Sequence, residues 1–330
     1  MKIFSKKYSA LTAIILAVCM FMLGACGEKD YGEDFTTEPL TDSGYAIESI
    51  TIEVPGLTQD YDLLLVADLH LLYNNDEVCS EDKDVVAARE KGFSPDGGKT
   101  TAASLWETMP DLLNKCNADY VLFAGDMVDF NSVANIDALK KGLDRLNTPY
   151  CYVRSDHDVV PFYMDVDAGE CDGAAIRRQN DIGVNSNAWY VDLGEIVVLC
   201  YNRSDKVISD VGIDVVREAI AIGKPIVMLS HVPFNSIVDT SLDESCKQIY
   251  GGRNLTWAKY DKGATEYTCL DAVGCDFLDL VYDADNGIKE IVCGHLHYSW
   301  DGEIAAGVRQ HVFSPAFVKI IGHISIRRTE

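Results

Sequence analysis

The sequence is poor in positive charge. Its 330 residues include 28 Lys and Arg against 52 Asp and Glu, which gives a formal net charge of −24 at pH 7. A polyanion would meet mostly repulsion from such a chain, so the composition argues against broad electrostatic binding of nucleic acid or of anionic lipid. Nucleic acid is therefore not an expected partner.

The signatures of several protein classes are missing as well. With 9 Pro, 25 Gly and 48% hydrophobic residues, the chain is neither disordered nor collagen-like. Its 11 cysteines include no CxxC pair of the kind that zinc ribbons use. Residues 93–101 fail as a phosphate-binding loop because Phe93 replaces the required glycine, and the sequence contains neither a G-x-S-x-G elbow nor an internal repeat. These absences leave one large globular domain or two modest ones.

The N-terminus has the pattern of an export signal. Lys2, Lys6 and Lys7 precede an apolar run at 10–23, which is shorter than the roughly 20 residues that a spanning helix requires. The run ends in Leu-Gly-Ala-Cys, which resembles the lipobox of bacterial lipoproteins, and this resemblance implies that Cys26 is diacylated and becomes the first mature residue. We therefore expect an extracytoplasmic protein that is lipid-anchored to a bacterial cell membrane. The alternatives are an uncleaved membrane helix, or secretion with Cys26 as an ordinary cysteine.

Three segments are expected on this basis: a signal peptide at 1–25, an acidic flexible tether at 26–46 and a single domain at 47–330. Residues 27–46 carry six acidic residues and one lysine, with too few apolar groups to order the segment. Nine cysteines follow Cys26, and an odd number outside the cytoplasm leaves at least one free thiol or an intermolecular link. Cys200 and Cys293 lie in apolar runs, which favours buried thiols over disulfides. The sequence leaves disulfide pairing and oligomeric state open.

Apolar runs alternate with segments of helical periodicity over the rest of the chain. Core-facing helix stripes are expected at Ile136, Leu139, Leu143 and Leu146, and at Val211, Val215, Ala219 and Ile222. Strands are expected at 63–67, 120–124, 150–153, 196–201, 225–229 and 288–293, with a hairpin at 188–201 and an all-β region at 302–326. This order predicts an α/β fold, a layered sandwich built on mixed sheets.

Two long stretches fit this rhythm poorly. Residues 73–104 are polar and charged, and residues 235–268 carry Tyr250, Trp257, Tyr260 and Tyr267 among glycines. Long insertions of this kind often form active-site lids or specificity loops. The alternative is that they are surface loops without a role, which is less in keeping with the aromatic residues of the second stretch.

Histidines and aspartates gather where the expected strands end. Asp68 and His70 follow the strand at 63–67, two residues apart, where an extended backbone directs both to one side. The other strand ends deliver Asp126 and Asp129; Asp156, His157 and Asp158; His231; and His295 and His297. Because the carboxyl ends of strands in such sheets face one crevice, we expect these groups to converge.

So many ionisable side chains in one crevice require neutralisation. Five of the 7 histidines lie in this set, and a divalent cation neutralises mixed carboxylate and imidazole groups at low cost. Seven or more oxygen and nitrogen donors are too many for one tetrahedral ion and suit two ions that share a carboxylate. Mn, Fe, Zn and Ni all accept such donors, so the sequence leaves the metal identity open.

The ordered blocks carry a family resemblance. The sequence reads D68-L-H70, G125-D-M-V-D129, S155-D-H-D158, H231 and G294-H-L-H297, and this set resembles the five blocks of the calcineurin-like metallophosphoesterase superfamily over residues 62–324. The resemblance implies an α/β/β/α sandwich of two mixed sheets. It also implies a metal-dependent phosphoric ester hydrolase that cleaves phosphomonoesters or phosphodiesters of small substrates by means of a hydroxide shared between two metal ions.

The resemblance also implies roles for individual residues. Asp68, His70 and His297 would bind one metal, Asp126 would bridge, and His231, His295 and Asp156 would bind the second metal. His157 would remain free of metal and would bind the phosphoryl group or protonate the leaving oxygen, with Asp129 orienting it.

The third block departs from the family pattern. Ser155 and Asp156 stand where the family has Gly and Asn. A carboxylate at 156 would bind a hard cation more tightly but lower its Lewis acidity, and slower turnover would follow. The alternative function is therefore a lipoprotein of the same fold that binds metal or a phosphorylated ligand without useful turnover.

The remaining polar residues near these motifs receive smaller roles. Asp158 is expected to hold the loop of the third block. Arg154 and Arg203 could contact phosphate, although a surface ion pair is the simpler role for each. His311 and His323 are expected to be structural, with His311 also a candidate for lining the pocket.

Overall fold

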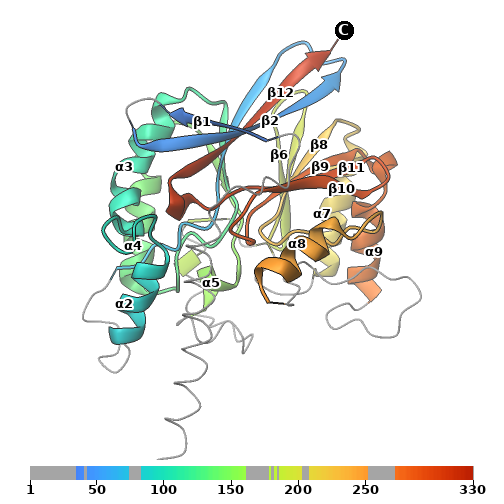
Figure 1. Ribbon diagram of the computed structural model, residues 1–330. Coiled ribbons are helices and arrows are strands. Elements are labelled where there is room, and N and C mark those ends of the chain that lie inside the picture. The colour runs from blue at the N-terminus through green and yellow to red at the C-terminus, as the bar shows by residue number, and fades with distance from the viewer. Residues whose placement is uncertain are drawn as a thin grey trace, which may run out of the picture.

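The computed structural model describes residues 35–40, 43–73, 83–160, 178–179, 182–183, 186–202, 208–251 and 272–329. Its strands form two six-stranded sheets (Figure 1). Within the described residues, no helix is both long and apolar enough to cross a membrane. The predicted signal peptide, Cys26, Arg203 and the aromatic residues Trp257, Tyr260 and Tyr267 all lie outside the described residues.

The first sheet has the strand order β1-β2-β12-β3-β4-β5. Strands β3, β4 and β5 run parallel, β12 runs antiparallel to β3 and parallel to β2, and β1 forms an antiparallel edge. The bounds are Thr36–Leu40 for β1, Tyr45–Pro55 for β2, Tyr61–Val66 for β3, Tyr120–Phe123 for β4, Tyr150–Tyr152 for β5 and Ile320–Thr329 for β12.

The second sheet has the strand order β10-β11-β9-β8-β7-β6. Its four central strands are parallel, and the hairpin partners β6 and β10 form antiparallel edges. The bounds are Ala188–Asp192 for β6, Val197–Tyr201 for β7, Ile226–Leu229 for β8, Ile288–Cys293 for β9, Trp300–Ala305 for β10 and Val308–Val312 for β11. The hairpin and the all-β tail predicted from the sequence are thereby confirmed.

Helices cover the outer face of each sheet. Beside the first sheet lie α2 (Lys83–Gly92), α3 (Ala102–Lys115) and α4 (Val133–Leu143), and beside the second lie α7 (Asp210–Ala221), α8 (Ser241–Ile249) and α9 (Ala272–Val281) (Figure 1). Short helices complete the order: α5 (Asp156–Val159), η2 (Ala284–Asn286) and η3 (Ala316–Val318). One apolar cluster fills the space between the sheets, and two others join the sheets to their helices. The predicted α/β/β/α sandwich is confirmed.

One helix stripe differs from its prediction. The stripe on α4 is buried at Ile136, Leu139 and Leu143 as expected. On α7 the buried apolar side chains are Ile213, Val216 and Ala219, whereas Val211 is 70% exposed. Ser209 is the N-cap residue and accepts a hydrogen bond from the Gly212 amide, so Val211 falls in the first turn on the solvent side. Of the predicted stripe, Ala219 is buried, and Val215 and Ile222 are partly buried and pack against the core, so only its first member, Val211, faces solvent.

The described part of the predicted tether belongs to the domain. Thr36–Leu40 pairs along its whole length with β2, and Phe35 packs edge-on against Phe313 at 5.0 Å between ring centroids. The side chains of β1 are mostly exposed, which is why their composition resembles that of a disordered segment. The ordered chain therefore starts before residue 47, and the neighbouring strand supplies the order.

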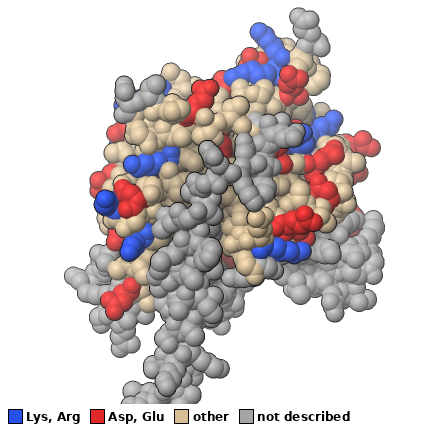
Figure 2. Space-filling model, viewed as in Figure 1, with Lys and Arg blue, Asp and Glu red and all other residues tan. Residues whose placement is uncertain are grey.

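The thiols and surface charges agree with the composition. Cys200 and Cys293 are fully buried free thiols, as the apolar runs predicted. On the face seen in Figure 2, Lys and Arg side chains are interspersed with Asp and Glu rather than gathered into one broad area.

Candidate metal centre

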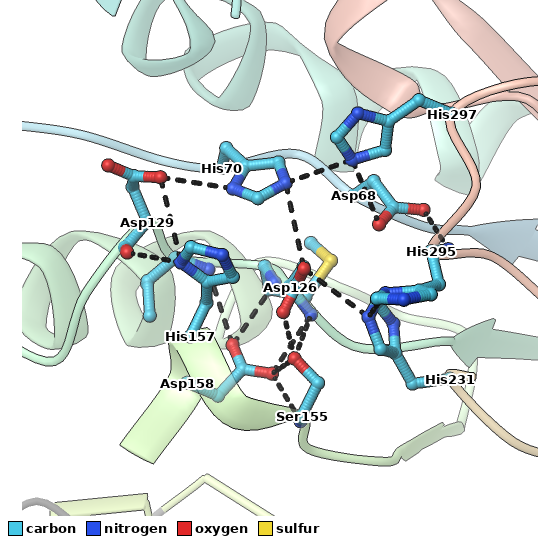
Figure 3. A network of polar contacts seen from close by, with 12 residues as sticks. Asp68, His70, Asp126, Asp129, Ser155, His157, Asp158, His231, His295 and His297 are labelled. Carbon is cyan, nitrogen blue, oxygen red and sulfur yellow. Dashed lines mark hydrogen bonds and ion pairs between the residues drawn. The ribbon is translucent and has the colours of Figure 1, made fainter. Parts of the chain in front are cut away.

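Six of the seven predicted metal ligands converge at the ends of the strands. Two groups have ligand atoms that all lie within 4.8 Å of one another (Figure 3). The first group consists of Asp68, His70 and His297, and the second of Asp126, His231 and His295. These side chains follow β3, β4, β8 and β9, so segments from both sheets build the site. The convergence inferred from the strand ends is confirmed in its geometry.

The backbone at the site is left-handed rather than extended. Five of the six ligand candidates have positive φ: Asp68 at 52°, His70 at 49°, Asp126 at 50°, His295 at 73° and His297 at 54°. For residues other than Gly this conformation costs roughly 1–2 kcal/mol each, and such residues cluster at functional sites. Asp68 and His70 do point to one side, but these left-handed turns direct them there, contrary to the extended backbone expected from the sequence.

Two motif glycines are required by close approach. A Cβ at Gly294 would collide with the Asp68 carboxylate, and a Cβ at Gly125 would lie 2.9 Å from His231 Nδ1. Gly125 also has a φ of 91° and its carbonyl accepts a hydrogen bond from the Asp68 amide. The glycines that precede Asp126 and His295 therefore let the ligand loops pack against one another.

The first group is built around His70. Its Nδ1 donates to Asp129 Oδ1 at 3.1 Å, which leaves the Nε2 lone pair for a metal ion. His70 Nε2 lies 3.2 Å from His297 Nε2, and His297 Nε2 lies 3.5 Å from Asp68 Oδ1. Burial lowers the pKa of His70 to about 4, although the neighbouring carboxylates act in the opposite direction. His70 is therefore neutral at pH 7, as a metal ligand must be.

The second group is built around His231. Its Nδ1 donates to the Ala124 carbonyl at 2.8 Å, so Nε2 faces the group, 3.2 Å from His295 Nδ1. Burial lowers the pKa of His295 to about 3. Burial acts in the same direction on His231, but the charges of Asp126 and Asp68 prevail and raise the pKa of His231 to about 10. Without a metal, a proton on His231 partly balances these carboxylates, and a cation would displace it.

Asp126 stands between the two groups. Its Oδ2 lies 3.3 Å from His231 Nε2 in the second group and 3.6 Å from His70 Nε2 in the first. Burial raises the pKa of Asp126, but the charges of His231 and His157 outweigh burial and hold that pKa well below its ordinary value. A charged carboxylate between two sets of nitrogen donors is the arrangement that two cations with a shared ligand require.

Comparisons with known proteins agree with this geometry. The family model of the calcineurin-like phosphoesterases matches residues 61–299, well over half of the chain. The chain belongs to this family. Among proteins of curated function, none matches the sequence.

Several solved structures are similar to this calcineurin-like phosphoesterase. A dimetal phosphatase from Danio rerio is 11% identical with a TM-score of 0.44, over 78% of this chain and 88% of its own. A purple acid phosphatase from yellow lupin (Lupinus luteus) seeds is 14% identical with a TM-score of 0.47, over 81% of this chain and 46% of its own. A putative 5′-nucleotidase from Staphylococcus aureus is 13% identical with a TM-score of 0.36, over 78% and 49%. The present chain therefore spans about half the length of the latter two.

The donor set fits the divalent metals that the family implies. Asp68 Oδ1 is buried and accepts no hydrogen bond from any described group, so a carboxylate oxygen faces the first group without a donor. The other donors are imidazole nitrogens and the Asp126 carboxylate, which suit Mn, Fe, Zn or Ni. The described residues of this phosphoesterase thus offer a place for a cation that their own hydrogen bonds do not fill.

A third cluster of ligand atoms lies next to a positively charged side chain, Arg89. The ligand atoms of His70, Asp129 and His157 also lie within 4.8 Å of one another. Arg89, however, donates to both carboxylate oxygens of Asp129, from Nε at 2.6 Å and from Nη2 at 2.5 Å. Burial raises the pKa of Asp129, but the charge of Arg89 outweighs it and keeps the carboxylate ionised. Both oxygens of this carboxylate accept hydrogen bonds from the guanidinium, so we assign Asp129 the role of supporting His70 rather than that of a metal ligand.

His157 is held by the backbone of Asp129. Its Nδ1 donates to the Asp129 carbonyl at 2.8 Å, whereas Asp129 Oδ1 is 3.8 Å away. Asp129 thus contacts His157, the predicted catalytic histidine, mainly through its main chain, and its carboxylate serves His70 and Arg89 instead. The His157 side chain is 18% exposed, more than His70 or His231, and its Nδ1 is the ring nitrogen that contacts Asp129.

Asp156 lies outside both ligand groups. No carboxylate oxygen of Asp156 belongs to any of the clusters found in the described residues, and the side chain is partly exposed at the start of α5. The hydroxyl of the neighbouring Ser155 instead donates a hydrogen bond to the Asp126 carboxylate. The ligand role that the family resemblance implied for Asp156 therefore stays a prediction.

Asp158 holds the third block, as predicted. Its carboxylate accepts hydrogen bonds from the amides of Asp126, Met127 and Ser155 at 2.9–3.1 Å, and from the Tyr152 hydroxyl at 2.7 Å. Burial and the charge of Asp126 raise the pKa of Asp158 to about 6. Asp158 therefore connects the loop after β4 to α5 and holds the backbone of Asp126 in place.

His311 and His323 belong to none of the donor groups found in the described residues. His323 pairs with Asp62 at 2.9 Å on the first sheet, and His311 pairs with Glu290 at 2.9 Å on the second, so both are structural. Arg154 is buried, and its amide donates to Asn202 at 2.8 Å. A surface ion pair, the simpler role expected for Arg154, does not fit this burial.

Both insertions contribute supports that sequence reasoning did not assign. The first contains α2, which supplies Arg89 to Asp129 and leads to Phe93, whose ring stacks on His70 at 3.9 Å. The second contains Tyr250, whose hydroxyl donates to the Leu296 carbonyl at 2.5 Å, between His295 and His297. None of these three residues lies in a motif, and only the position of the insertions beside the motif strands could have suggested their role.

Proposed function

We propose that this protein is a two-metal phosphoesterase that hydrolyses phosphomonoester or phosphodiester bonds of a small substrate. The observation that carries the proposal is the position of Asp126, whose Oδ2 lies 3.6 Å from His70 in one donor group and 3.3 Å from His231 in the other. Membership of the calcineurin-like phosphoesterase family supports the same reaction class.

Six side chains would hold the metals. Asp68, His70 and His297 would bind the first ion, and His231 and His295 the second, with Asp126 shared between them. When bound, two such cations lower the pKa of a shared water and clamp phosphate oxygens for in-line attack on phosphorus. The buried walls around His70, Asp68 and Asp126 exclude bulk water, which strengthens every electrostatic interaction in the site.

His157 would handle the proton of the leaving group. Its Nδ1–H is committed to the Asp129 carbonyl, so Nε2 is the atom that gains or loses a proton. Its ring meets His70 edge-on with 4.9 Å between centroids, which places it next to the first donor group. A protonated Nε2 would first attract the phosphoryl oxygens and then protonate the departing oxygen.

We also propose that the protein is anchored at the cell surface through Cys26. The support is the sequence pattern alone: a basic start, a short apolar run and Leu-Gly-Ala-Cys. Two acyl chains suffice for stable attachment. Metabolic labelling with a fatty-acid analogue should mark the wild-type chain in a bacterial host and leave Cys26→Ser unlabelled; equal labelling of both would reject the anchor.

A metal-dependent assay tests the proposed reaction. The full chain, purified in detergent, is stripped with a chelator, reloaded with Mn²⁺ and offered an aryl phosphate and a bis-aryl phosphodiester. Turnover of either compound is expected, and none by the stripped protein. Asp144→Asn, which alters the C-cap residue of α4, an exposed side chain that is 63% accessible, should retain full activity.

Two negative results have different meanings. Binding of about two equivalents of Mn²⁺ without turnover of either compound would favour the alternative, a metal- or phosphate-ligand-binding lipoprotein of the same fold. Binding of less than one equivalent would reject the metal centre itself. A wider panel of nucleotides, sugar phosphates, phospholipid head groups and diesters would then narrow the substrate.

A further inference from the structure

Helix α2 brings two side chains from outside the five motifs to the first donor group. Arg89 lies on the helix, and Phe93 follows its last turn, with its amide donating to the Arg89 carbonyl at 2.9 Å. The Arg89 guanidinium carbon lies 4.9 Å from the centroid of the Phe93 ring. The two side chains therefore act as one unit attached to a single helical turn.

This unit contacts His70 on two sides. In the plane of the imidazole, Arg89 holds Asp129 with two hydrogen bonds, and Asp129 Oδ1 accepts from His70 Nδ1 at 3.1 Å. On its face, the imidazole stacks on Phe93 with a centroid distance of 3.9 Å and an angle of 4° between the planes. The contacts from Arg89 to Asp129, His70 and Phe93 and back to Arg89 form a closed ring.

This closed cycle of contacts fixes both the rotation and the tautomer of the His70 side chain. A carboxylate only accepts hydrogen bonds, so Asp129 requires the proton on Nδ1 and leaves the lone pair on Nε2. Stacking on Phe93 prevents the imidazole from tilting. Arg89 matters because Asp129 is fully buried: its side chain is 0% exposed and that of Arg89 only 11%, so the planar fork sets the direction of the carboxylate.

We propose that Arg89 is a positioning residue for the first metal site, acting through Asp129 on His70, with Phe93 as its partner. The inference rests on the proposed function, since it takes His70 as a metal ligand. It implies that α2, part of the insertion at 73–104, sets the metal affinity of one half of the centre while contributing no ligand.

A calorimetric titration of the metal-stripped full-length chain with Mn²⁺ tests the role of Arg89. The wild type is expected to bind two equivalents. Arg89→Ala should weaken one of the two binding events by about 10–100-fold, the range found for groups that orient metal ligands, and leave the other within about twofold. Arg89→Lys keeps the positive charge but not the planar donor fork, so its affinity for the weakened Mn²⁺ should lie between those of the wild type and Arg89→Ala.

Two further measurements separate positioning from general stability. If Arg89 acts through metal affinity, excess Mn²⁺ should restore most of the kcat of Arg89→Ala. Arg145→Ala serves as the matched control, because Arg145 also holds an aspartate, Asp111 at 2.5 Å, but on the surface between α3 and α4. Its Mn²⁺ affinities should match those of the wild type.

The possible failures are distinguishable. Wild-type affinities in both Arg89 variants, or equal weakening of both binding events, would overturn the positioning role while leaving the two-metal proposal intact. Less than one equivalent bound by the wild type would reject the two-metal proposal itself. If Arg89→Ala does not fold, because Asp129 becomes an unpaired buried charge, Arg89→Lys decides the question by the same criterion.

Discussion

The two halves of the proposed metal centre are supported in different ways. In the second half, His231 is oriented by the main-chain carbonyl of Ala124 at 2.8 Å, where β4 ends. In the first half, His70 is oriented by the side chain of Asp129, which Arg89 from α2 holds in turn. One half thus derives its geometry from the sheet, and the other depends on particular side chains in an insertion.

This difference determines where substitutions can act. A backbone carbonyl is present whatever residue stands at 124, so the support of His231 tolerates changes in sequence. The support of His70 requires a carboxylate at 129 and a planar donor fork at 89, and it is lost if either residue changes. Variation in metal affinity should therefore arise mainly in the first half.

Asp126→Asn should have the largest effect, because Asp126 belongs to both halves. The amide removes the charge that His70 and His231 share, so both Mn²⁺ binding events should weaken. With several kcal/mol of transition-state stabilisation lost and 1.36 kcal/mol per factor of ten, kcat/KM should fall by about 10³-fold or more. Steady-state kinetics and calorimetry check this. Loss of only one binding event would show that Asp126 serves one half alone.

The sequence predicted the parts of the centre that depend on the sheets. Asp68, Asp126 and His231 could be placed because parallel strands bring their carboxyl ends to one edge. The same rule does not fix the conformation of the residues beyond each strand, and the left-handed backbone of His70, with φ of 49°, contradicts the extended form expected. Local patterns locate a ligand better than they describe the turn that directs it.

Contacts between distant segments were beyond the sequence. Arg89 and Asp129 are 40 residues apart, and the polar composition of 73–104 gave no reason to pair them. Periodicity likewise located α7, but Ser209 as its N-cap residue fixed which side faces the core, and this left Val211 exposed. Tertiary packing chooses among alternatives that local sequence leaves equivalent.

Asp156→Asn should have an intermediate effect and would settle which half, if either, Asp156 serves. Its carboxylate belongs to neither donor group found in the described residues, so the substitution removes a charge without altering a member of those groups. We expect either Mn²⁺ binding event to weaken by no more than about fivefold, as for a partly exposed charge. A loss above about 100-fold confined to one event would make Asp156 a ligand after all, and a strong gain in kcat would favour the weakened-enzyme alternative.

Asp62→Asn should have the smallest effect, since it alters a histidine–carboxylate pair outside both halves. Asp62 accepts hydrogen bonds from His323 at 2.9 Å and Arg327 at 2.6 Å, and its side chain is 42% exposed. Burial raises the pKa of Asp62, but these hydrogen bonds and charges outweigh it and lower the pKa below its ordinary 3.8. A lowered folded-state pKa contributes stability above the unfolded value, and that stability is lost as the pH falls through the folded value. In urea denaturation, the free energy of unfolding of Asp62→Asn should therefore be at most about 1 kcal/mol below that of the wild type at pH 7, and this difference should become smaller near pH 3. A difference that grew on acidification would contradict the role assigned to Asp62.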